Sequence, residues 1–413
     1  MKSWESLPVQ DLSSDFSFPR MHLSDTASDQ KKPLPSKDLY RMYVCGITPY
    51  DATHLGHAAT YLSFDLIFRY LTAGGSTVDY VQNITDIDEP LLERANRDNV
   101  DWNQLAGDQV NLFRSDMTAL NVIAPTHYVG AIEAIPLVTQ AIDLLSAKKS
   151  TYEIDKDIYF SVKDDVNFAS ISHLEDAEMI RIFAQRGGDP NLVGKKDPLD
   201  CLVWMQQRPN EPGWPSIHGL GRPGWHIECT AIALNYLKSA INEPTLIDIQ
   251  GGGSDLIFPH HEMCAAQARI ISGRELASHY VHAGMIGLDG EKMSKSKGNL
   301  VFVSSLLAAG VDPFVIRWTL MSDHYRTDRM WSQEKLEKST VEVERLRSAL
   351  VRDHVAPTSG LIEQILNSLS NDLDTPSVVE ALNEWADVSL TDSTGGDSHQ
   401  LKVVLENLLG YKS

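Results

Sequence analysis

Apolar and polar positions in the first part of the chain describe a strand, a helix and a second strand. Residues 39–50, "LYRMYVCGITPY", alternate in polarity and are rich in β-forming side chains, which predicts a strand ending near Cys45. Residues 53–75 carry apolar side chains at helical spacing and end in Gly-Gly, which is typical of a helix C-terminus. Residues 76–88 predict a second strand and a turn. This βαβ order indicates the start of a parallel sheet.

The pattern changes after the second strand. Between about residues 90 and 195 it is mostly helical, with one predicted hairpin at 150–162, "STYEIDKDIYFSV", and we interpret this segment as an insertion. A helix at 224–241 and a strand at 245–250 then resume the sheet. From about Ser339 onward the pattern is helical again, which predicts a helical C-terminal part.

Composition fits a soluble globular protein, because 42% of the 413 residues are apolar and 22% are charged. A chain of this length has room for about two to three domains. The N-terminus shows no apolar core of a signal peptide, and no apolar run is long enough for a membrane span. Four cysteines do not make a disulfide framework, so we expect a cytoplasmic protein with cysteines free for metal or packing.

The charge argues against a large nucleic-acid partner. The net charge is −20, and residues 361–413 hold two basic against nine acidic residues, a net of −7. Because binding to phosphates requires lysine and arginine, a tail of this kind does not suit a tRNA-gripping domain. A solvated acidic helical tail is sufficient to explain it.

The first candidate site is "THLGHA", residues 53–58, between the first strand and the first helix. Open α/β sheets bind ligands at this position, and a helix N-terminus favours phosphate. His54 and His57 add donors on the same turn, and Gly56 allows a flat base to approach the backbone. The alternative is a pair of surface histidines that cap a helix.

The second candidate is "EKMSKSKGN", residues 291–299, which has the composition of a mobile cationic loop. Lys292 and Lys295 are compact charges suited to a phosphate in transfer, although a solvated basic loop would explain this segment taken by itself. Together, however, H-x-G-H and K-M-S-K-S are the two signatures of class I aminoacyl-tRNA synthetases, which the chain therefore resembles.

The likeness to cysteinyl-tRNA synthetase extends over roughly residues 39–340. It is carried by "MYVCGITPYDATHLGHA", "VQNITDIDE", "KKDPLDCLVW", "GRPGWHIEC", "GGGSDLIFPHHE", "KMSKSKGN" and "HYRTDRMWSQEKLEKS". The resemblance implies a class I synthetase-like Rossmann catalytic domain with an inserted domain and a C-terminal helical bundle. The expected parts are an N-terminal extension (1–38), the catalytic domain (39–300, insertion about 115–195), a connecting helical region (301–338) and the helical bundle (339–413).

One stretch separates two groups of this family. "QRGGDP", residues 185–190, resembles the E-R-G-G-D-P motif of the cysteine:glucosaminyl-inositol ligases of mycothiol biosynthesis, although Gln185 replaces the glutamate. "CGITPYDATHLGHAATYL" and "AGMIGLDGEKMSKS" are also closer to those ligases. The resemblance implies a monomeric enzyme that uses L-cysteine, Mg-ATP and glucosaminyl-inositol (GlcN-Ins), with no tRNA and no membrane partner. The alternatives are a shortened cysteinyl-tRNA synthetase and an inactive, binding-only paralogue.

The resemblance also implies one zinc ion per chain, held by Cys45, Cys229 and His260. Thiolate and imidazole are ligands that zinc prefers, and a site that binds substrate keeps a position open. Cys264 lies one helical turn after His260, where the synthetases place a glutamate ligand, so it is either a further ligand or a small buried side chain. Cys201 matches an apolar position and is expected to be packing.

The remaining expected site residues surround the nucleotide. The resemblance assigns His54, His57, Lys292 and Lys295 to stabilising the transition state of activation. Asp255 is also a guess for the base of the second step. The residues expected to bind the cysteinyl adenylate are Cys45, Gly46, Ile47, Thr48, Thr60, Asn83, Ile84, Thr85, Trp225, Gly253, Ser254, Asp255 and Ile286.

Overall fold

A five-stranded parallel sheet forms the centre of the molecule in the computed structural model, which describes residues 1–237, 239, 241–288, 290–293, 299–391 and 395–412. Each of its neighbouring strands is paired in parallel. The strand order is β12-β11-β3-β4-β5, an open α/β sheet whose first βα unit lies at its middle. The bounds are β3 (Leu39–Val44), β4 (Thr77–Ile84), β5 (His127–Gly130), β11 (Thr245–Gly253) and β12 (Glu275–Ala283).

Helices cover this sheet on both faces. Helix α1 (Leu55–Ala73) follows β3 and is buried along most of its length, because the sheet lies on one side of it and the C-terminal helices on the other. On the other face lie α4 (Ala131–Ala147), α6 (Trp225–Tyr236) and α7 (Glu262–Ser272), which pack against one another. The fold class predicted from the sequence is confirmed.

The insertion forms a second, antiparallel sheet with the order β6-β7-β8-β10-β9. Strand β5 belongs to the parallel sheet, whereas β6 to β10 form the antiparallel sheet. The four residues of β5 are too few to show the alternation of a strand, so the sequence of this region predicts helices alone. The bounds are β6 (Thr151–Ile154), β7 (Asp157–Phe160), β8 (Cys201–Gln206), β9 (Trp214–Ser216), β10 (Gly219–Pro223), η1 (Val162–Asp164) and α5 (Asp176–Gln185).

Smaller elements frame the carboxyl edge of the parallel sheet. Helices α2 and α3 follow β4, and a three-stranded sheet, β14-β13-β15, follows β12. An N-terminal hairpin packs beside β12. The bounds are β1 (His22–Asp25), β2 (Gln30–Pro33), α2 (Glu89–Asp98), α3 (Trp102–Ala119), η2 (Ser254–Leu256), η3 (Ile257–His261), β13 (Ile286–Leu288), β14 (Glu291–Lys292), α8 (Val303–Ala308), α9 (Pro313–Met321) and β15 (Arg329–Trp331).

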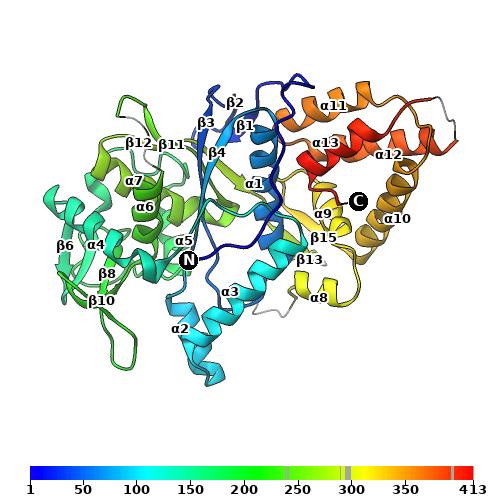
Figure 1. Ribbon diagram of the computed structural model, residues 1–413. Coiled ribbons are helices and arrows are strands. Elements are labelled where there is room, and N and C mark those ends of the chain that lie inside the picture. The colour runs from blue at the N-terminus through cyan, green and yellow to red at the C-terminus, as the bar shows by residue number, and fades with distance from the viewer. Residues whose placement is uncertain (238, 240, 289, 294–298, 392–394, 413) are drawn as a thin grey trace.

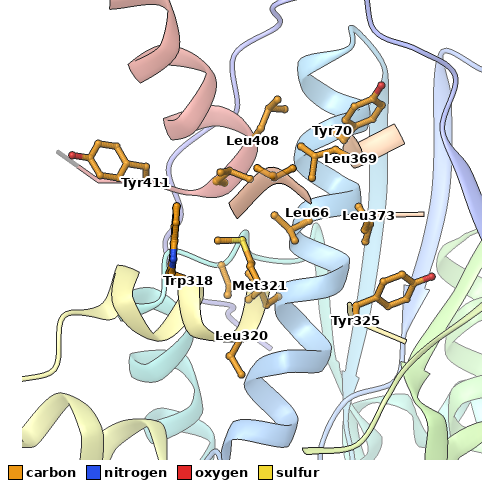
Figure 2. Close-up of a cluster of buried hydrophobic side chains, with 14 of the residues drawn as sticks. Leu66, Tyr70, Trp318, Leu320, Met321, Tyr325, Leu369, Leu373, Leu408 and Tyr411 are labelled. Atoms are coloured by element: carbon orange, nitrogen blue, oxygen red, sulfur yellow. The ribbon is translucent and has the colours of Figure 1, made fainter. Parts of the chain in front are cut away.

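The C-terminal helices pack against the catalytic domain and share its core. Figure 2 shows side chains of α1, α9 and the C-terminal segments converging, among them Leu66, Trp318, Leu369 and Leu408. Figure 1 shows α13 beside α1, with α12 farther away beside α10. The bounds are α10 (Gln333–Leu350), α11 (Ser359–Ser370), α12 (Thr375–Thr391) and α13 (His399–Leu409).

A buried charge network crosses this junction. Asp65 on α1 accepts hydrogen bonds from Arg69 Nε (2.9 Å) and from Arg317 Nη2 on α9 (2.7 Å). Both guanidinium groups also donate to backbone carbonyls, and Arg317 reaches the carbonyl of Leu409 (2.7 Å). Because buried charges require complete pairing, this network fixes α1, α9 and α13 together.

None of the described helices has the length and the apolar character required to cross a membrane.

Candidate active site and metal centre

Two thiols and one imidazole from distant parts of the chain meet below the carboxyl edge of the parallel sheet. Cys45 follows β3, Cys229 lies on α6, and His260 lies in η3. Their donor atoms all lie within 4.8 Å of one another, and all three side chains are buried. The Cys229 Sγ atom is 4.0 Å from Cys45 Sγ and 3.2 Å from His260 Nε2. A buried Cys₂His set of this kind could hold a metal ion.

The electrostatics of the three groups favour a thiolate at Cys229 beside an imidazolium at His260. Burial opposes ionisation of Cys229, but the hydrogen bond from Cys45 and the charge of His260 outweigh it and hold its pKa well below the usual value. Burial also opposes protonation of His260, yet the sulfurs of Cys264 and Cys229 raise its pKa well above the usual value. The pKa of Cys45 is raised, first by burial and then by Cys229. Metal ligands must be deprotonated, so bound metal would compete with these protons.

Partners outside the cluster orient its members. His226 Nδ1 lies 3.0 Å from His260 Nδ1, which leaves Nε2 of His260 facing Cys229. On the opposite side, His261 Nε2 lies 3.2 Å from Cys45 Sγ, and His261 Nδ1 lies 2.7 Å from His282 Nε2. Ligating histidines in metal sites commonly have a partner at the second nitrogen, so this arrangement fits a metal-binding role.

Gln250 and these three histidines were not among the residues expected from the sequence. Gln250 Nε2 donates to Cys45 Sγ at 3.4 Å. The only signal that could have indicated His226 and His261 is their position beside a ligand, in "GWHIEC" and "FPHHE". His282 lies in β12 three residues after His279, and no sequence pattern separates it from a packing residue.

The other two cysteines lie outside the three-residue cluster. Cys264 Sγ is 3.8 Å from His260 Nε2, but it donates to the backbone carbonyl of His226 at 3.3 Å. Whether Cys264 becomes a ligand therefore stays a prediction. Cys201 is buried in the core of the insertion, with Gln267 Nε2 at 3.5 Å from its sulfur.

The turns after β3 and β4 are joined at the residues expected to bind the adenylate. The Gly46 N–H donates to Asn83 Oδ1 at 2.8 Å, and the Thr85 N–H donates to the Ile47 carbonyl at 3.0 Å. A Cβ at Gly46 would lie 1.6 Å from the Asn83 carbonyl oxygen, so only glycine fits there. Asn83 also donates to Thr85 Oγ1 at 3.3 Å. This part of the expected set forms one continuous surface.

The rest of the expected adenylate set surrounds this surface. Trp225 stacks on the His260 ring, with 4.4 Å between centroids. A Cβ at Gly253 would lie 3.9 Å from Thr60 Oγ1, which places the end of β11 beside α1. Asp255 accepts, at its backbone carbonyl, a hydrogen bond from Arg186 of the insertion. Of the remaining members, Ile84, Ile286 and Ile47 are buried, whereas Thr48 and Ser254 are half-buried.

His54 and His57 lie at the start of α1, where the sequence placed them. Their rings are stacked with centroids 3.7 Å apart. His54 Nδ1 accepts the N–H groups of Gly56 (3.1 Å) and His57 (3.4 Å), so it caps the helix. The capping bonds use Nδ1 of the His54 ring, and a phosphate would be bound at the opposite side of the ring, so the two roles are compatible. Lys292 ends β14, and Lys295 lies outside the described residues.

The parallel sheet, the capped H-x-G-H helix and the ligand surface at the carboxyl edge define a class I tRNA synthetase type of catalytic domain. The family model for the class I (C) tRNA synthetase catalytic domain matches residues 31–341. Among solved structures, methionyl-tRNA synthetase of Mycobacterium tuberculosis with methionyl-adenylate superposes with a TM-score of 0.60 at 16% identity, over 90% of this chain and 88% of that one. That likeness concerns the fold.

Curated relatives define the group more narrowly. The chain is 48% identical to L-cysteine:1D-myo-inositol 2-amino-2-deoxy-alpha-D-glucopyranoside ligase of Thermomonospora curvata, over 99% of both chains. It is 51% identical to the ligase of that name in Nakamurella multipartita, over 100% of both chains. The Streptomyces coelicolor ligase is 49% identical over 96% of this chain and 95% of its own. The chain belongs to this ligase family within the class I synthetases.

Proposed function

We propose that this protein activates L-cysteine with ATP and joins it to the amine of 1D-myo-inositol 2-amino-2-deoxy-α-D-glucopyranoside (GlcN-Ins). The observation that carries the proposal is the identity of 48–51% to ligases of that name over essentially the whole chain. The expected products are the cysteinyl amide, AMP and diphosphate. The enzyme is therefore a ligase that forms a C–N bond.

The reaction divides into two transfers. In the first, a carboxylate oxygen of cysteine attacks the α-phosphorus of ATP, the P–O bond to the β-phosphate breaks, and diphosphate leaves. In the second, the amine nitrogen attacks the carbonyl carbon of cysteinyl adenylate, the C–O bond breaks, and AMP leaves with the electron pair. The nitrogen loses a proton as the amide forms.

Several residues of this chain support the first transfer. The surface formed by Gly46 and Asn83 allows the adenylate to lie close to the protein backbone. The N-terminus of α1, with His54 at its cap, favours the negative charge of phosphate. Lys292 and Lys295 are proposed to stabilise charge on the departing diphosphate, as transition-state donors do.

Zinc fits the donor set of Cys45, Cys229 and His260. The three donors are two sulfurs and one imidazole nitrogen, all buried, and the second nitrogen of His260 has a partner in His226. When bound, zinc supplies a soft affinity for sulfur that a hydroxyl cannot match. The chain would thereby distinguish cysteine from serine, which an apolar pocket separates poorly.

The acceptor decides between this function and that of a shortened cysteinyl-tRNA synthetase. Gln185, which replaces the glutamate of the ligase motif, is the observation that favours the second candidate. The test supplies enzyme, ATP and radiolabelled cysteine with either GlcN-Ins or tRNA. We expect label in the amino sugar product, with AMP release accelerated by GlcN-Ins and not by tRNA. Label in tRNA with an inert amino sugar would refute the proposal.

A further inference from the structure

Asp88 lies beside the expected adenylate surface, and its side chain does not make the usual capping bond to the helix that it begins. It occupies the N-cap position of α2 but makes no capping hydrogen bond there. The N-cap residues of α3 and α9, Asp101 and Asp312, both accept backbone N–H groups of the first turn. An aspartate at this position normally caps its helix, whereas the Asp88 carboxylate accepts hydrogen bonds from the Thr48 hydroxyl and from the N–H of the next residue, Glu89.

That carboxylate is turned toward the active site. Its Oδ2 atom accepts the Thr48 hydroxyl at 3.0 Å, and Thr48 lies three residues after Cys45. Asp88 also lies three residues after Thr85, on the other turn of the adenylate surface. Asp88 and Thr48 are both half-buried, so the pair is accessible at the edge of this surface.

The surroundings of Asp88 leave its charge without a close cation among the described residues. Arg222 is the nearest basic contributor, but its Nη2 atom is bonded to Glu89 (2.6 Å) and Glu211 (3.3 Å). Buried Glu228 faces the same region, with its Oε2 atom lacking a hydrogen-bond partner. The charged and titratable groups around Asp88 are thus Arg222 of β10, Glu89 of α2, Glu228 of α6 and Tyr50 of the turn after β3.

This setting suits a proton acceptor. Burial raises the pKa of Asp88, while the hydrogen bond from Thr48 and the charge of Arg222 oppose the rise. A carboxylate that holds a proton more tightly than an ordinary aspartate is a better general base near neutral pH. A primary amine carries a proton near neutral pH and must lose it before attack, and the attacking nitrogen loses another as the amide forms.

We propose that Asp88 is the base that accepts the proton of the acceptor amine in the second transfer. The N–H bond breaks as the C–N bond forms, the proton passes to Asp88 Oδ, and AMP takes the electron pair of the broken C–O bond. Solvent then removes the proton from Asp88. This inference rests on the proposed function and supplies the base that it lacks. Asp255, the residue suggested from the sequence as this base, would contact the nucleotide instead, since its carboxylate lies next to Gly253.

The test compares two nucleophiles in one sample. Asp88→Asn keeps an oxygen for the Thr48 hydroxyl but cannot take a proton. Cysteine-dependent ATP–diphosphate exchange should stay within about threefold of wild type, while amide formation with GlcN-Ins should fall by roughly 10²–10⁴-fold. Hydroxylamine, small and uncharged at pH 7, should still capture the adenylate as cysteine hydroxamate. The matched control, Asp101→Asn, alters the exposed cap of the neighbouring helix α3 and should leave the ratio of amide to hydroxamate unchanged.

The ratio of amide to hydroxamate does not depend on how much enzyme folds. It also separates the proposed function from the proposed role of Asp88. Wild-type enzyme that forms hydroxamate but no amide would refute the GlcN-Ins acceptor. Wild-type enzyme that forms both, with an unchanged ratio in Asp88→Asn, would refute the role of Asp88. If Asp88→Asn forms neither product, Asp88→Glu takes its place. Loss of both products in both variants overturns the inference, because Asp88 would then serve cysteine activation.

The pH dependence gives a second readout that a structural role would not move. In wild type, the rate of amide formation should decline at low pH as Asp88 becomes protonated. This acidic limb of the pH profile should lie above the ordinary aspartate pKa of about 3.9. In Asp88→Asn this limb should disappear, while the pH profile of exchange should be unchanged. A limb that persists in the variant would contradict the assignment.

Discussion

Cys229 and Cys201 are equally buried, with 2% of each side chain exposed, but their surroundings differ. Cys229 faces a second thiol and an imidazole, whereas Cys201 lies in the apolar core of the insertion. Burial raises the pKa of Cys201 to about 12, so this thiol stays protonated. The pKa of Cys229 is lowered instead, which suits a ligand.

This contrast defines a matched pair of variants. Cys229→Ala should lose bound zinc and cysteine-dependent ATP–diphosphate exchange while the protein stays folded. The reason is that the metal would bind the substrate and would not stabilise the hydrophobic core. Cys201→Ala should keep both, at a cost in stability from lost packing. Metal analysis of the purified proteins, with circular dichroism to verify folding, measures the outcome. Full zinc occupancy in Cys229→Ala would refute the ligand assignment.

The position of Cys264 would decide how many sulfurs coordinate a bound zinc ion. If it turns from the His226 carbonyl toward the cluster, the substrate-free enzyme should show three Zn–S distances of about 2.3 Å by X-ray absorption. If it stays in its present hydrogen bond, two sulfurs are expected. Cys264→Ser provides the control, because its spectrum should change only in the first case.

At the residue scale, the sequence indicates the three members of the Cys₂His cluster only through family resemblance. Cys45, Cys229 and His260 come from three separate elements, and no spacing rule connects them. The periodicity of the strands and helices predicts where each element lies, but not which side chains converge. His282 illustrates the limit, because its role depends on a 2.7 Å contact with His261 that no local pattern encodes.

Among the elements, strand β14 ends at Lys292, one of the two lysines proposed to act in cysteine activation. Lys292→Ala and Lys295→Ala should each slow adenylate formation by roughly 10²–10³, the usual cost of one transition-state donor. Affinity for a preformed adenylate analogue should change far less, because the departing diphosphate is absent from it. Single-turnover activation and calorimetric binding measure the two effects. A large loss of analogue affinity with normal activation would contradict the assignment.

The success of prediction also varied between elements. Strand β3, helix α1 and strand β4 lie where their periodicity placed them, because each is long and buried along a regular face. Strand β11 runs on through its three glycines to Gly253, beyond the predicted end at Gln250. Pairing with β12 continues through those glycines, so tertiary contacts override their low strand propensity.

For the whole molecule, the buried network around Asp65 ties the catalytic domain to the C-terminal helices. Arg317→Met should lower the free energy of unfolding by about 3–5 kcal/mol, because it leaves part of a buried charge and the Leu409 carbonyl without partners. Arg347→Met removes a half-exposed pair with Asp312 of similar length, 2.6 Å, and should cost about 1 kcal/mol or less.

Urea denaturation at constant metal content measures both variants. Equal losses in the two would show that the junction contributes nothing beyond an ordinary surface ion pair. A single transition in wild type is also expected, because the helices and the sheet share one apolar core.

The same network has a consequence for the order in which a ribosome delivers the chain. Helix α1 emerges early, yet its Asp65 accepts a hydrogen bond from Arg317 and its Arg69 donates to the Asn407 carbonyl, and both of these partners are made much later. Cys45 likewise emerges long before Cys229 and His260. A nascent chain must therefore hold the Asp65–Arg69 pair without Arg317, and Cys45 without the other two members of its cluster, until those residues have been made. The network around Asp65 can be completed only after the C-terminal helices have been made, and a metal ion that requires all three donors could bind only after His260 has been made.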